Sequence, residues 1–599
     1  MLRNDAGHFA GSRLSAMTDE PTDVFTPQWR ATPPAPGTYR EALMFDPKSR
    51  SHPSAGWVRM FLDEFGISED EFVISFPTGD EPITVSERPQ LAPAHRAALA
   101  DIVGAENAED DDVSRVRYGL GKSLDEDIQL RRGQTPLLPD LVLHPRDKND
   151  VAQIVAYCNE HRIPIVPFGG GSTVVLGTKV NEGGVVLALG THMNKIVEVN
   201  DLNQTVTVQP GMFGPAYEAA LNTYGYTGGH FPQSFQLSTV GGWITALGSG
   251  QASTYYGDAY DLVLAQEYVT PAGTLTTKHF PATANGPKVN DILKGSEGTF
   301  GVLVELTLRI YRHAPENTSR FALMMPSWEA AVDAAREITQ GEFGKPAVLR
   351  ISDPEETERG LALKGYSSGL PATYLDKRGM KAGSRCLLLG NAEGEKGFTK
   401  HVAKMALKTG RDHGGINLTA KATKAWEHGR YSDIHLRNDL VDFGLIIDTF
   451  ETSVTWDNVI NLHTKVREFI KSRPATMSLT HASHFYGPGT NLYFILILKP
   501  ESPEEYYEFR SQVLAKIIEH GGSPSHHHGT GELAGHLMES HLGTEQMDVL
   551  RALKEHFDPN HIMNPGRTLG LNTTVRQRRA TPGGSGKRGS GRSKKASSQ

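Results

Sequence analysis

The stretch IPIVPFGGGSTVVLG, residues 163–177, leads from a short apolar run straight into three consecutive glycines. The apolar run predicts a buried strand, and the glycines predict a loop whose backbone N–H groups can approach a phosphate closely. The spacing fits neither the GxGxxG pattern of dinucleotide-binding loops nor the GxxxxGK(S/T) pattern of nucleoside-triphosphate loops. Most glycine loops are plain turns, so the meaning of this one depends on the segments around it.

The segments on both sides of this loop are dense in strands. Residues 148–161 follow Asp147, a good helix cap, and carry apolar residues at helical spacing, from Val151 to Cys158. Short β-like runs occupy residues 141–145, 184–189, 196–200, 205–211, 262–275 and 301–312. After residue 318 strands and helices alternate again, with a buried strand at 492–499 and helices at 503–520 and 544–557. The pattern predicts two α+β domains.

Length and composition narrow the class of protein. A chain of 599 residues should form two or more domains, and Cys158 and Cys386 alone cannot build a disulfide framework or a zinc–cysteine site. No apolar run is long enough to cross a bilayer, and the first residues lack a secretory signal, which predicts a cytoplasmic protein.

The net charge of −8 conceals an uneven distribution of charge along the chain. The last 27 residues carry eight Lys/Arg and no acid, which leaves −8 − 8 = −16 on the remainder. An acidic body argues against nucleic acid as a partner. The basic Gly/Ser-rich tail is expected to lack fixed structure and to aid solubility, with contact to anionic lipid headgroups as the alternative.

Two further glycine-rich segments and the chain end complete the pattern. They are GGHFPQSFQLSTVGGWITALGSGQASTYYG at 228–257, ILKGSEGTFGVLVELTLRI at 292–310 and FDPNHIMNPGR at 557–567. In this order with the first loop, they resemble the FAD-binding domain of the vanillyl-alcohol-oxidase (p-cresol methylhydroxylase) superfamily. The resemblance covers about residues 136–315 and 557–567.

Four other stretches narrow the resemblance: GHFPQSFQLSTVGGW (229–243), RYSDIHLRND (430–439), TFETSVTWDNVINL (449–462) and SHHHGTG (525–531). Over about residues 60–570 the chain resembles the alkyldihydroxyacetonephosphate synthase family. The resemblance implies non-covalent FAD and exchange of the acyl group of acyl-dihydroxyacetone phosphate for a long-chain fatty alcohol. The substrate carbon would be held at flavin N5, with no net redox change.

The resemblance also implies a fold and a division of the chain. The expected fold is α+β: a two-subdomain FAD-binding domain at 136–315 and an α+β substrate (cap) domain at 316–555. Residues 1–40 are expected to be disordered, 41–135 to form a helical segment with a strand at 72–77, 556–572 to return to the flavin domain, and 573–599 to form the disordered basic tail.

The family's site residues carry over onto this sequence by position. Cofactor contacts fall on Pro167, Gly169, Gly170, Gly171, Ser172, Thr173, Ser234, Ser238, Thr239, Glu297, Gly298, Thr299 and Gly301. The catalytic acid/base falls on Tyr486, its pKa expected to be lowered by nearby cations or histidine. Arg437 and Arg350 would bind the substrate, and His526, His527 and His528 would relay protons or bind phosphate.

Some features of the sequence leave alternatives open. Gln233 stands where the family has an acid, and Leu247 where it has an arginine, which puts the electrostatic tuning of the flavin in doubt. Three adjacent histidines point different ways and cannot all bind one ion, so no metal is expected, although His526 and His528 could pair with a distant carboxylate. His481 and His484 could line the pocket or be ordinary loop residues.

The sequence is also compatible with other functions. A flavin-dependent 2-hydroxyacid (D-lactate or glycolate type) dehydrogenase is the main alternative, and a flavoprotein fold kept for binding alone is a second. The expected partners are the lipid substrates and a second copy of the chain in a homodimer, with peripheral membrane contact and no nucleic acid. The final SSQ is not the C-terminal peroxisomal tripeptide.

Overall fold

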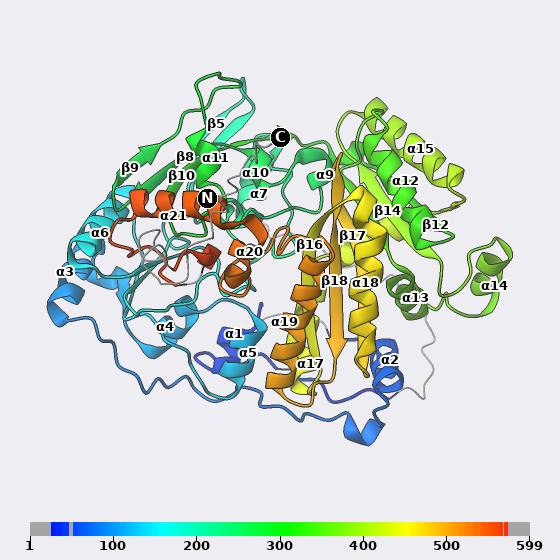
Figure 1. Ribbon diagram of the computed structural model, residues 1–599, viewed down its shortest axis with the longest axis horizontal. Helices are drawn as coiled ribbons and strands as arrows, with labels where there is room; N and C mark the ends of the chain where they lie inside the picture. Colours follow the sequence, from blue (N-terminus) through cyan, green and yellow to red (C-terminus); the bar gives the residue numbers. More distant parts are fainter. Residues whose placement is uncertain (1–24, 31, 47–51, 567, 573–599) are drawn as a thin grey trace, which may run out of the picture.

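The computed structural model describes residues 25–30, 32–46, 52–566 and 568–572. Figure 1 shows two lobes: a first lobe with several small sheets, and a second lobe built on one large sheet that includes the long strands β16, β17 and β18. The expected disorder of residues 1–24 and of the basic tail from 573 falls outside the described residues.

A four-stranded sheet carries the glycine loop. Its order is β1 (Ala108–Glu109), β2 (Leu141–Leu143), β4 (Val185–Ala188), β3 (Ile165–Phe168), with β2, β4 and β3 parallel. Helices α3 (Pro93–Val103) and α6 (Lys148–His161) pack on it through a cluster that includes Ile154 and Cys158. Asp147 caps α6 by accepting the N–H groups of Asn149 and Asp150, which confirms the helix predicted there.

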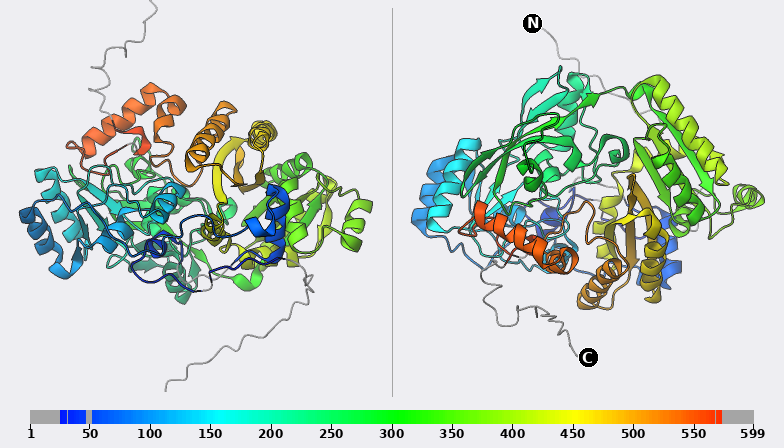
Figure 2. Two further views of the ribbon diagram at one scale, coloured as in Figure 1. Left: turned by 90° about the horizontal axis from the view of Figure 1, so that it is seen from below. Right: turned by 45° about the horizontal axis from the view of Figure 1, so that its top comes forward.

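A five-stranded antiparallel sheet forms the rest of the first lobe. Its order is β5 (Ile196–Asn200), β6 (Thr205–Val208), β10 (Val302–Arg309), β8 (Val263–Thr270), β9 (Gly273–Thr276), and β7 (Tyr226–Thr227) pairs with β11 (Tyr311–Arg312) beside it. Helices α7 (Gly214–Thr223), α8 (Val240–Thr245), α10 (Ala259–Leu262) and α21 (Thr544–Phe557) share its buried cluster. Figure 2 shows α21 lying over this lobe.

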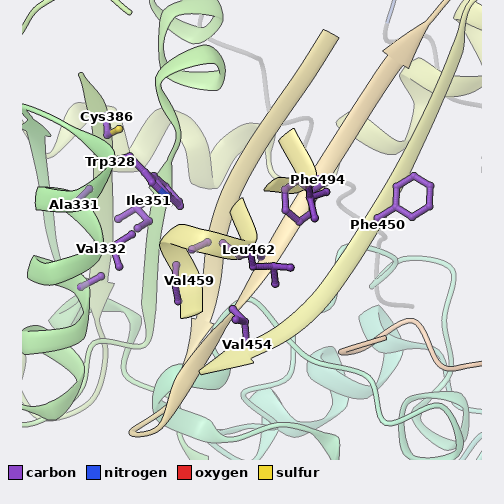
Figure 3. Close-up of a cluster of buried hydrophobic side chains, with 14 of the residues drawn as sticks. Trp328, Ala331, Val332, Ile351, Cys386, Phe450, Val454, Val459, Leu462 and Phe494 are labelled. Atoms are coloured by element: carbon purple, nitrogen blue, oxygen red, sulfur yellow. The ribbon is translucent and has the colours of Figure 1, made fainter. Parts of the chain in front are cut away.

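The second lobe is one seven-stranded antiparallel sheet. Its order is β15 (Ile416–Leu418), β12 (Ser319–Met325), β14 (Cys386–Ala392), β13 (Val348–Ser352), β17 (Thr476–Phe485), β18 (Gly489–Leu498), β16 (Ile446–Thr455). Helices α12 (Trp328–Gln340), α15 (Lys396–Asp412), α18 (Val459–Ser472) and α19 (Pro503–Glu519) contribute to its main buried cluster. In Figure 3, Trp328 of α12 and Leu462 of α18 point into this cluster with Ile351 of β13.

The end of the chain returns to the strand that precedes the glycine loop. Ile165 pairs with Met563 in an isolated parallel bridge, and its N–H and C=O bond to Ile562 and Asn564, each at 2.7 Å. Ile562 and Met563 are buried in the cluster of the four-stranded sheet. Residues about 400 positions apart in the sequence therefore fix the start of the glycine loop together.

The segment before the first lobe differs from the sequence-based expectation in two places. Residues 72–77 form no strand, because Ser75 and Phe76 both donate their N–H groups to the carbonyl of Asp442. Residues 25–30 and 32–40 have defined positions, since Trp29 packs edge-on against Phe443 with ring centroids 4.8 Å apart. The expected disorder is therefore wrong for these residues.

The remaining helices are short. They are α1 (Tyr39–Leu43), α2 (Ala55–Phe65), α4 (Asp112–Gly119), α5 (Leu124–Arg131), α9 (Ser253–Tyr256), α11 (Val289–Leu293), α13 (Pro354–Leu363), α14 (Gly369–Lys377), α16 (Lys421–Gly429), α17 (Leu436–Asp442) and α20 (Met538–Leu542), with 3-10 turns at Glu69–Glu71, Ala105–Asn107, Pro315–Asn317, Asp433–His435, Trp456–Asn458, Gly535–Leu537 and Thr568–Gly570. Among the described helices, none is long and apolar enough to cross a bilayer.

Candidate active site

The glycine loop packs against the second glycine-rich segment at distances that only glycine allows. A Cβ atom on Gly170 would lie 2.1 Å from the carbonyl oxygen of Leu237, and one on Gly169 would lie 2.4 Å from Oγ1 of Thr239. Gly171 has a φ of +64°, in the left-handed region. A side chain at Gly169 or Gly170 would push the two segments apart, and one at Gly171 would meet the Phe168 ring at 2.3 Å, which explains the run of three glycines.

Three hydroxyl side chains predicted as cofactor contacts already have protein partners. Ser238 Oγ donates to the carbonyl of Ser234 at 2.9 Å and accepts the Trp243 indole N–H at 2.7 Å. Thr239 Oγ1 accepts the Gly242 N–H at 3.3 Å, which begins α8, and Thr299 Oγ1 donates to its own loop. These side chains shape the loops, so any contact they make with a cofactor would come mainly from their backbone.

Glu297 joins three segments that are far apart in the sequence. Its carboxylate accepts the backbone N–H groups of Thr530 at 2.7 Å and Gly531 at 2.8 Å, directly after the histidine triplet. The Asn564 side-chain amide donates to the carbonyls of Glu297 at 2.7 Å and Gly177 at 3.2 Å. Burial raises the pKa of Glu297 to about 7, against the two N–H bonds that favour the anion. The side chain therefore ties the histidine loop to the glycine loop.

The donors around the glycine loop fit a diphosphate-bearing cofactor. Within the described part of the chain, the backbone N–H groups of Gly171, Ser172 and Thr173 make no hydrogen bond. Thr178 Oγ1 and Asn564 Oδ1 are buried there without a partner. Buried polar groups are nearly always paired, so these orphan groups at a close-packed glycine loop fit FAD. Pro167, Gly298 and Gly301 complete the loop, with Gly298 packed against the Pro167 ring.

A cavity lies between the second glycine-rich segment and the large sheet. The first lobe lines it with Gln233 and Ser249, and the second lobe with Arg350, His481, His484 and His527, among others. Both uncertain histidines, His481 and His484, thus line the pocket. Residue 233, where the chain departs from its family, faces this cavity directly. Leu247 instead packs beside Gly295, in a left-handed conformation with φ of +53°.

Tyr486 follows the last residue of β17 and points its hydroxyl into the contact between the lobes. The hydroxyl donates to Oδ2 of Asp258 at 2.5 Å and lies 2.8 Å from Nε2 of His526. Burial, then the adjacent Asp258 carboxylate, raises the pKa of Tyr486 well above its usual value. The expected lowering of this pKa is therefore wrong, because the nearest charge is an anion and the neighbouring histidine is neutral.

The histidine triplet wraps around one carboxylate through its backbone. Glu451 of β16 accepts the N–H of His526, the N–H of His527 at 3.1 Å and the N–H of His528 at 3.0 Å. The rings of the first two meet, with their Nδ1 atoms 2.9 Å apart. Burial, with the neighbouring His528, lowers the pKa of His526 to about 3, and burial likewise lowers that of His527 far below its usual value. Both rings are neutral near pH 7.

The Glu451 carboxylate also bears on whether the histidine triplet could bind a metal ion. Possible ligand atoms of Glu451, His526 and His527 lie within 4.8 Å of one another. Both carboxylate oxygens already accept backbone N–H groups, however, so they are poorly placed to bind an ion as well. The pair that the structure brings together is also not the His526–His528 pair considered from the sequence. The absence of metal ligands stays a prediction.

The two predicted substrate arginines lie in different surroundings. Arg350 of β13 lines the cavity, and its Nη2 donates to Glu356 at 2.6 Å and to Nδ1 of His481 at 3.0 Å. Burial alone would raise the pKa of Glu356, but Arg350 and His481 hold it at about 2. Arg350 is therefore paired with a carboxylate as well as facing the cavity.

Arg437 of α17 is not among the described residues that line this cavity. Its Nη1 donates to the Lys122 carbonyl at 2.8 Å, and its guanidinium lies 4.6 Å from the Phe45 ring centre. Nε and Nη2 are buried without a hydrogen bond, although Nε lies 3.8 Å from Oδ2 of Asp127. The Lys122 N–H bonds to the Thr173 carbonyl at 2.7 Å, so Lys122 links Arg437 to the Thr173 end of the glycine loop. The structure does not bring Arg437 together with Arg350.

Sequence reasoning missed Asp258, Ser249 and Glu451. Ser249 lies in the glycine-rich segment 228–257 and Asp258 directly follows it, where both have the character of ordinary loop residues, and Glu451 is one position of the stretch 449–462. His484 was undecided, and its place depends on a bulge in β17 between Ser483 and Phe485, where its φ is +55°. No spacing signal in the sequence connects these residues to Tyr486, His484 or the histidine triplet, because those partners lie more than 70 positions away.

The comparisons with known proteins fit this geometry. Residues 139–278 match the model of the FAD binding domain family, and residues 314–568 match that of FAD linked oxidases, C-terminal domain. The chain therefore has the two-part organisation of FAD-linked oxidases, which confirms the expected fold class. FAD is the cofactor of that class.

More specific relatives narrow this class. An alkyldihydroxyacetonephosphate synthase of Dictyostelium discoideum is 30% identical over 479 residues, 77% of this chain and 78% of that protein. A solved alkyldihydroxyacetonephosphate synthase structure has a TM-score of 0.73 and 28% identity, covering 85% of this chain and 92% of that one. A glycolate oxidase subunit of Bacillus subtilis is 26% identical and covers 78% and 95%. The chain belongs to the alkyldihydroxyacetonephosphate synthase family.

Proposed function

We propose that this protein is an FAD-dependent alkyldihydroxyacetonephosphate synthase, which exchanges the acyl group of acyl-dihydroxyacetone phosphate for a long-chain fatty alcohol. The observation that carries the proposal is the contact of the Tyr486 hydroxyl with His526, at 2.8 Å, beside a cavity that both lobes line. A simple dehydrogenase needs a base at its substrate, whereas the exchange also needs protons returned to a leaving group and to the product carbon.

The chain's own residues would hold the cofactor in the first lobe. We infer that the backbone of Gly169, Gly170, Gly171, Ser172 and Thr173 holds the diphosphate, and that Pro167, Ser234, Ser238, Thr239 and the loop from Glu297 to Gly301 shape the site around the ring. FAD, when bound, supplies an electron-poor ring that can hold the substrate carbon reversibly. The close contact between glycine loop and second segment keeps this backbone rigid and pre-organised.

Tyr486 would work as a proton carrier between the Asp258 carboxylate and a neutral histidine. Its raised pKa keeps the hydroxyl protonated near neutral pH, so a resident phenolate is not available as a base. A hydroxyl with one acceptor and one histidine at hydrogen-bonding distance can pass a proton on as it receives another. Burial keeps water away from this path and protects the carbanion-like substrate from unproductive protonation.

Two separate cationic sites would recognise anionic groups. Arg350 faces the cavity, where we infer that its planar guanidinium binds the substrate phosphate while His481 and Glu356 hold it in place. Arg437 is linked through Lys122 to the end of the glycine loop and has a buried Nη2 without a partner, so we infer an anion of the substrate or the cofactor there. Both guanidinium groups are largely removed from solvent, which strengthens each interaction by lowering the local dielectric.

An enzyme with amphiphilic substrates has to reach a lipid surface, and one face of the second lobe is suited to it. Leu370 is 86% exposed, and Tyr366 and Tyr374 are about half exposed, on and beside α14. Lys377 is the last residue of the same helix, and Arg378 is its C-cap residue. We infer peripheral contact with anionic membranes through this face. The homodimer and the cytoplasmic setting stay predictions, and light scattering tests the first.

One assay tests the function. Purified holoprotein is incubated with acyl-dihydroxyacetone phosphate and a long-chain alcohol, and the alkyl ether is measured by mass spectrometry. Ether formation, with release of the fatty acid and without net bleaching of the flavin, is the expected result. Absence of ether together with flavin bleaching by D-lactate or glycolate would instead establish the 2-hydroxyacid dehydrogenase.

A further inference from the structure

The carboxylate of Asp258 accepts hydrogen bonds from two hydroxyl groups, one on each oxygen. Its Oδ2 lies 2.5 Å from the Tyr486 hydroxyl, and its Oδ1 accepts the hydroxyl of Ser249. An ionised carboxylate is an acceptor only, so each of these hydroxyls must turn its single proton toward Asp258. The carboxylate thereby decides which group is the donor in each further hydrogen bond that the Tyr486 and Ser249 hydroxyls make.

From Tyr486, this constraint on donor and acceptor roles extends to the histidine triplet. Since the tyrosine proton points at Asp258, the 2.8 Å contact with His526 requires an N–H on Nε2 of that ring. A neutral His526 then has a bare Nδ1, and the 2.9 Å contact with His527 requires an N–H on Nδ1 of the second ring. The bonds run His527 to His526 to Tyr486 to Asp258, each group donating to the next.

From Ser249, the same constraint on donor and acceptor roles extends to His484. The Ser249 oxygen lies 2.8 Å from Nδ1 of His484, and the Ser253 oxygen lies at the same distance. Because the Ser249 proton is directed at Asp258, Nδ1 of His484 carries the proton that completes this contact. Two donor chains, one from the histidine loop and one from His484 of β17, therefore converge on one carboxylate, and both end there.

Tyr486 needs a partner that can take its proton. The groups facing its hydroxyl are Asp258, His526 and Ser249, with Asp261 acting from one helical turn further. His526 already carries its proton on the nitrogen that faces Tyr486, and its strongly lowered pKa opposes a second one. Serine is far too weak a base. Of these groups, Asp258 is therefore the one whose oxygen already accepts the tyrosine hydroxyl and has a lone pair that can take its proton.

We propose that Asp258 is the terminal proton acceptor of the active site. The inference rests on the proposed function. As the C–H bond beside the substrate carbonyl breaks, its proton passes to the Tyr486 oxygen and the tyrosine proton passes to Oδ2 of Asp258. The electron pair stays on the substrate carbon, so nothing is oxidised or reduced in this step. The proton returns by the same path when the product carbon is protonated.

A purely structural role for Asp258 predicts a different outcome for one substitution. Asp258 is the N-cap residue of α10 and forms a capping box with Asp261. Asparagine is as good a helix cap as aspartate and has almost the same shape, but it has no charge and accepts no proton. Asp258→Asn therefore keeps the helix start while removing the acceptor, and Asp258→Ala removes both.

The experiment measures two steps in the holoenzyme. Mass spectrometry follows exchange of the reacting substrate hydrogen with solvent deuterium, and ether formation is followed in parallel. We expect Asp258→Asn to keep the flavin spectrum and Tm of the wild type while both rates fall about 100-fold or more. Combining it with Tyr486→Phe should cost no more than the worse single variant, since the two residues act as one relay. Exchange within about threefold of the wild type would overturn the proposal.

A second readout does not depend on activity. Tyrosine carrying a fluorine at ring position 3, placed at 486, reports its ionisation by 19F NMR. We expect its titration to move to lower pH in Asp258→Asn, because the neighbouring charge is gone, and an unchanged titration would overturn the direct pairing. If the wild type forms no ether but this titration shifts, the proposed function fails while the tyrosine–aspartate pair stands.

Discussion

The carboxylate of Glu451 accepts the backbone N–H of His527 at 3.1 Å, in the middle of three consecutive histidines that all donate to it. A single buried side chain of β16 thus sets the course of the histidine loop. The rings then lie where burial keeps them neutral, rather than where they could share an ion.

Replacing Glu451 with glutamine should disrupt this loop. The amide presents N–H groups where the carboxylate accepted them, so at least one buried backbone donor loses its partner at a cost of about 1–3 kcal/mol. We expect a lower Tm and loss of most ether formation, with FAD still bound, in a thermal melt and activity assay. The matched change at the exposed Glu519, Glu519→Gln, should leave both unchanged, and equal effects at the two sites would contradict this view.

Tyr486→Phe tests the proton carrier directly. Removing one oxygen leaves the ring in place but breaks the contacts with Asp258 and His526. We expect ether formation to fall by about 100-fold or more while the flavin absorption spectrum stays the same. Tyr224→Phe, at a 60% exposed tyrosine, is the control. Loss of bound FAD in Tyr486→Phe would show that the residue is structural.

Arg350→Lys tests recognition of the substrate phosphate. Lysine keeps the charge but loses the planar fork that donates to Glu356 and His481. We expect KM for acyl-dihydroxyacetone phosphate to rise about tenfold, with KM for the alcohol unchanged, in steady-state kinetics. Arg336→Lys, on the outer face of α12, should change neither value. A rise in both KM values would point to a general distortion of the cavity.

The pKa of Glu297, raised to about 7, predicts a pH dependence of stability. A carboxyl whose pKa is raised on folding contributes stability that is full below its unfolded pKa and is lost as pH rises through 7. Denaturant unfolding of the holoprotein at pH 5 and pH 8 should therefore show a larger fall for wild type than for Glu297→Gln. The exposed Glu182→Gln should behave like wild type. A parallel fall in all three proteins would assign the effect to other groups.

Much of the fold could be predicted from the sequence because its signals are local. The strand and three glycines at 165–171, the capped helix from Lys148 and the antiparallel strands after residue 196 are set by side-chain periodicity and by backbone freedom. The predicted strand at 72–77 failed because its N–H groups found a carbonyl at Asp442, far along the chain. A local pattern cannot report that competition.

The sequence by itself determined the glycine loops, the succession of most strands along the chain and the residue types of the candidate site, including Tyr486 and the three histidines. Only the tertiary structure decided their chemistry. It placed Asp258 against Tyr486, Glu451 against His526 and Glu297 against Thr530, and these pairs are 228, 75 and 233 positions apart in the sequence. Protonation depends on burial and on the nearest charge, and both arise only when distant segments pack together.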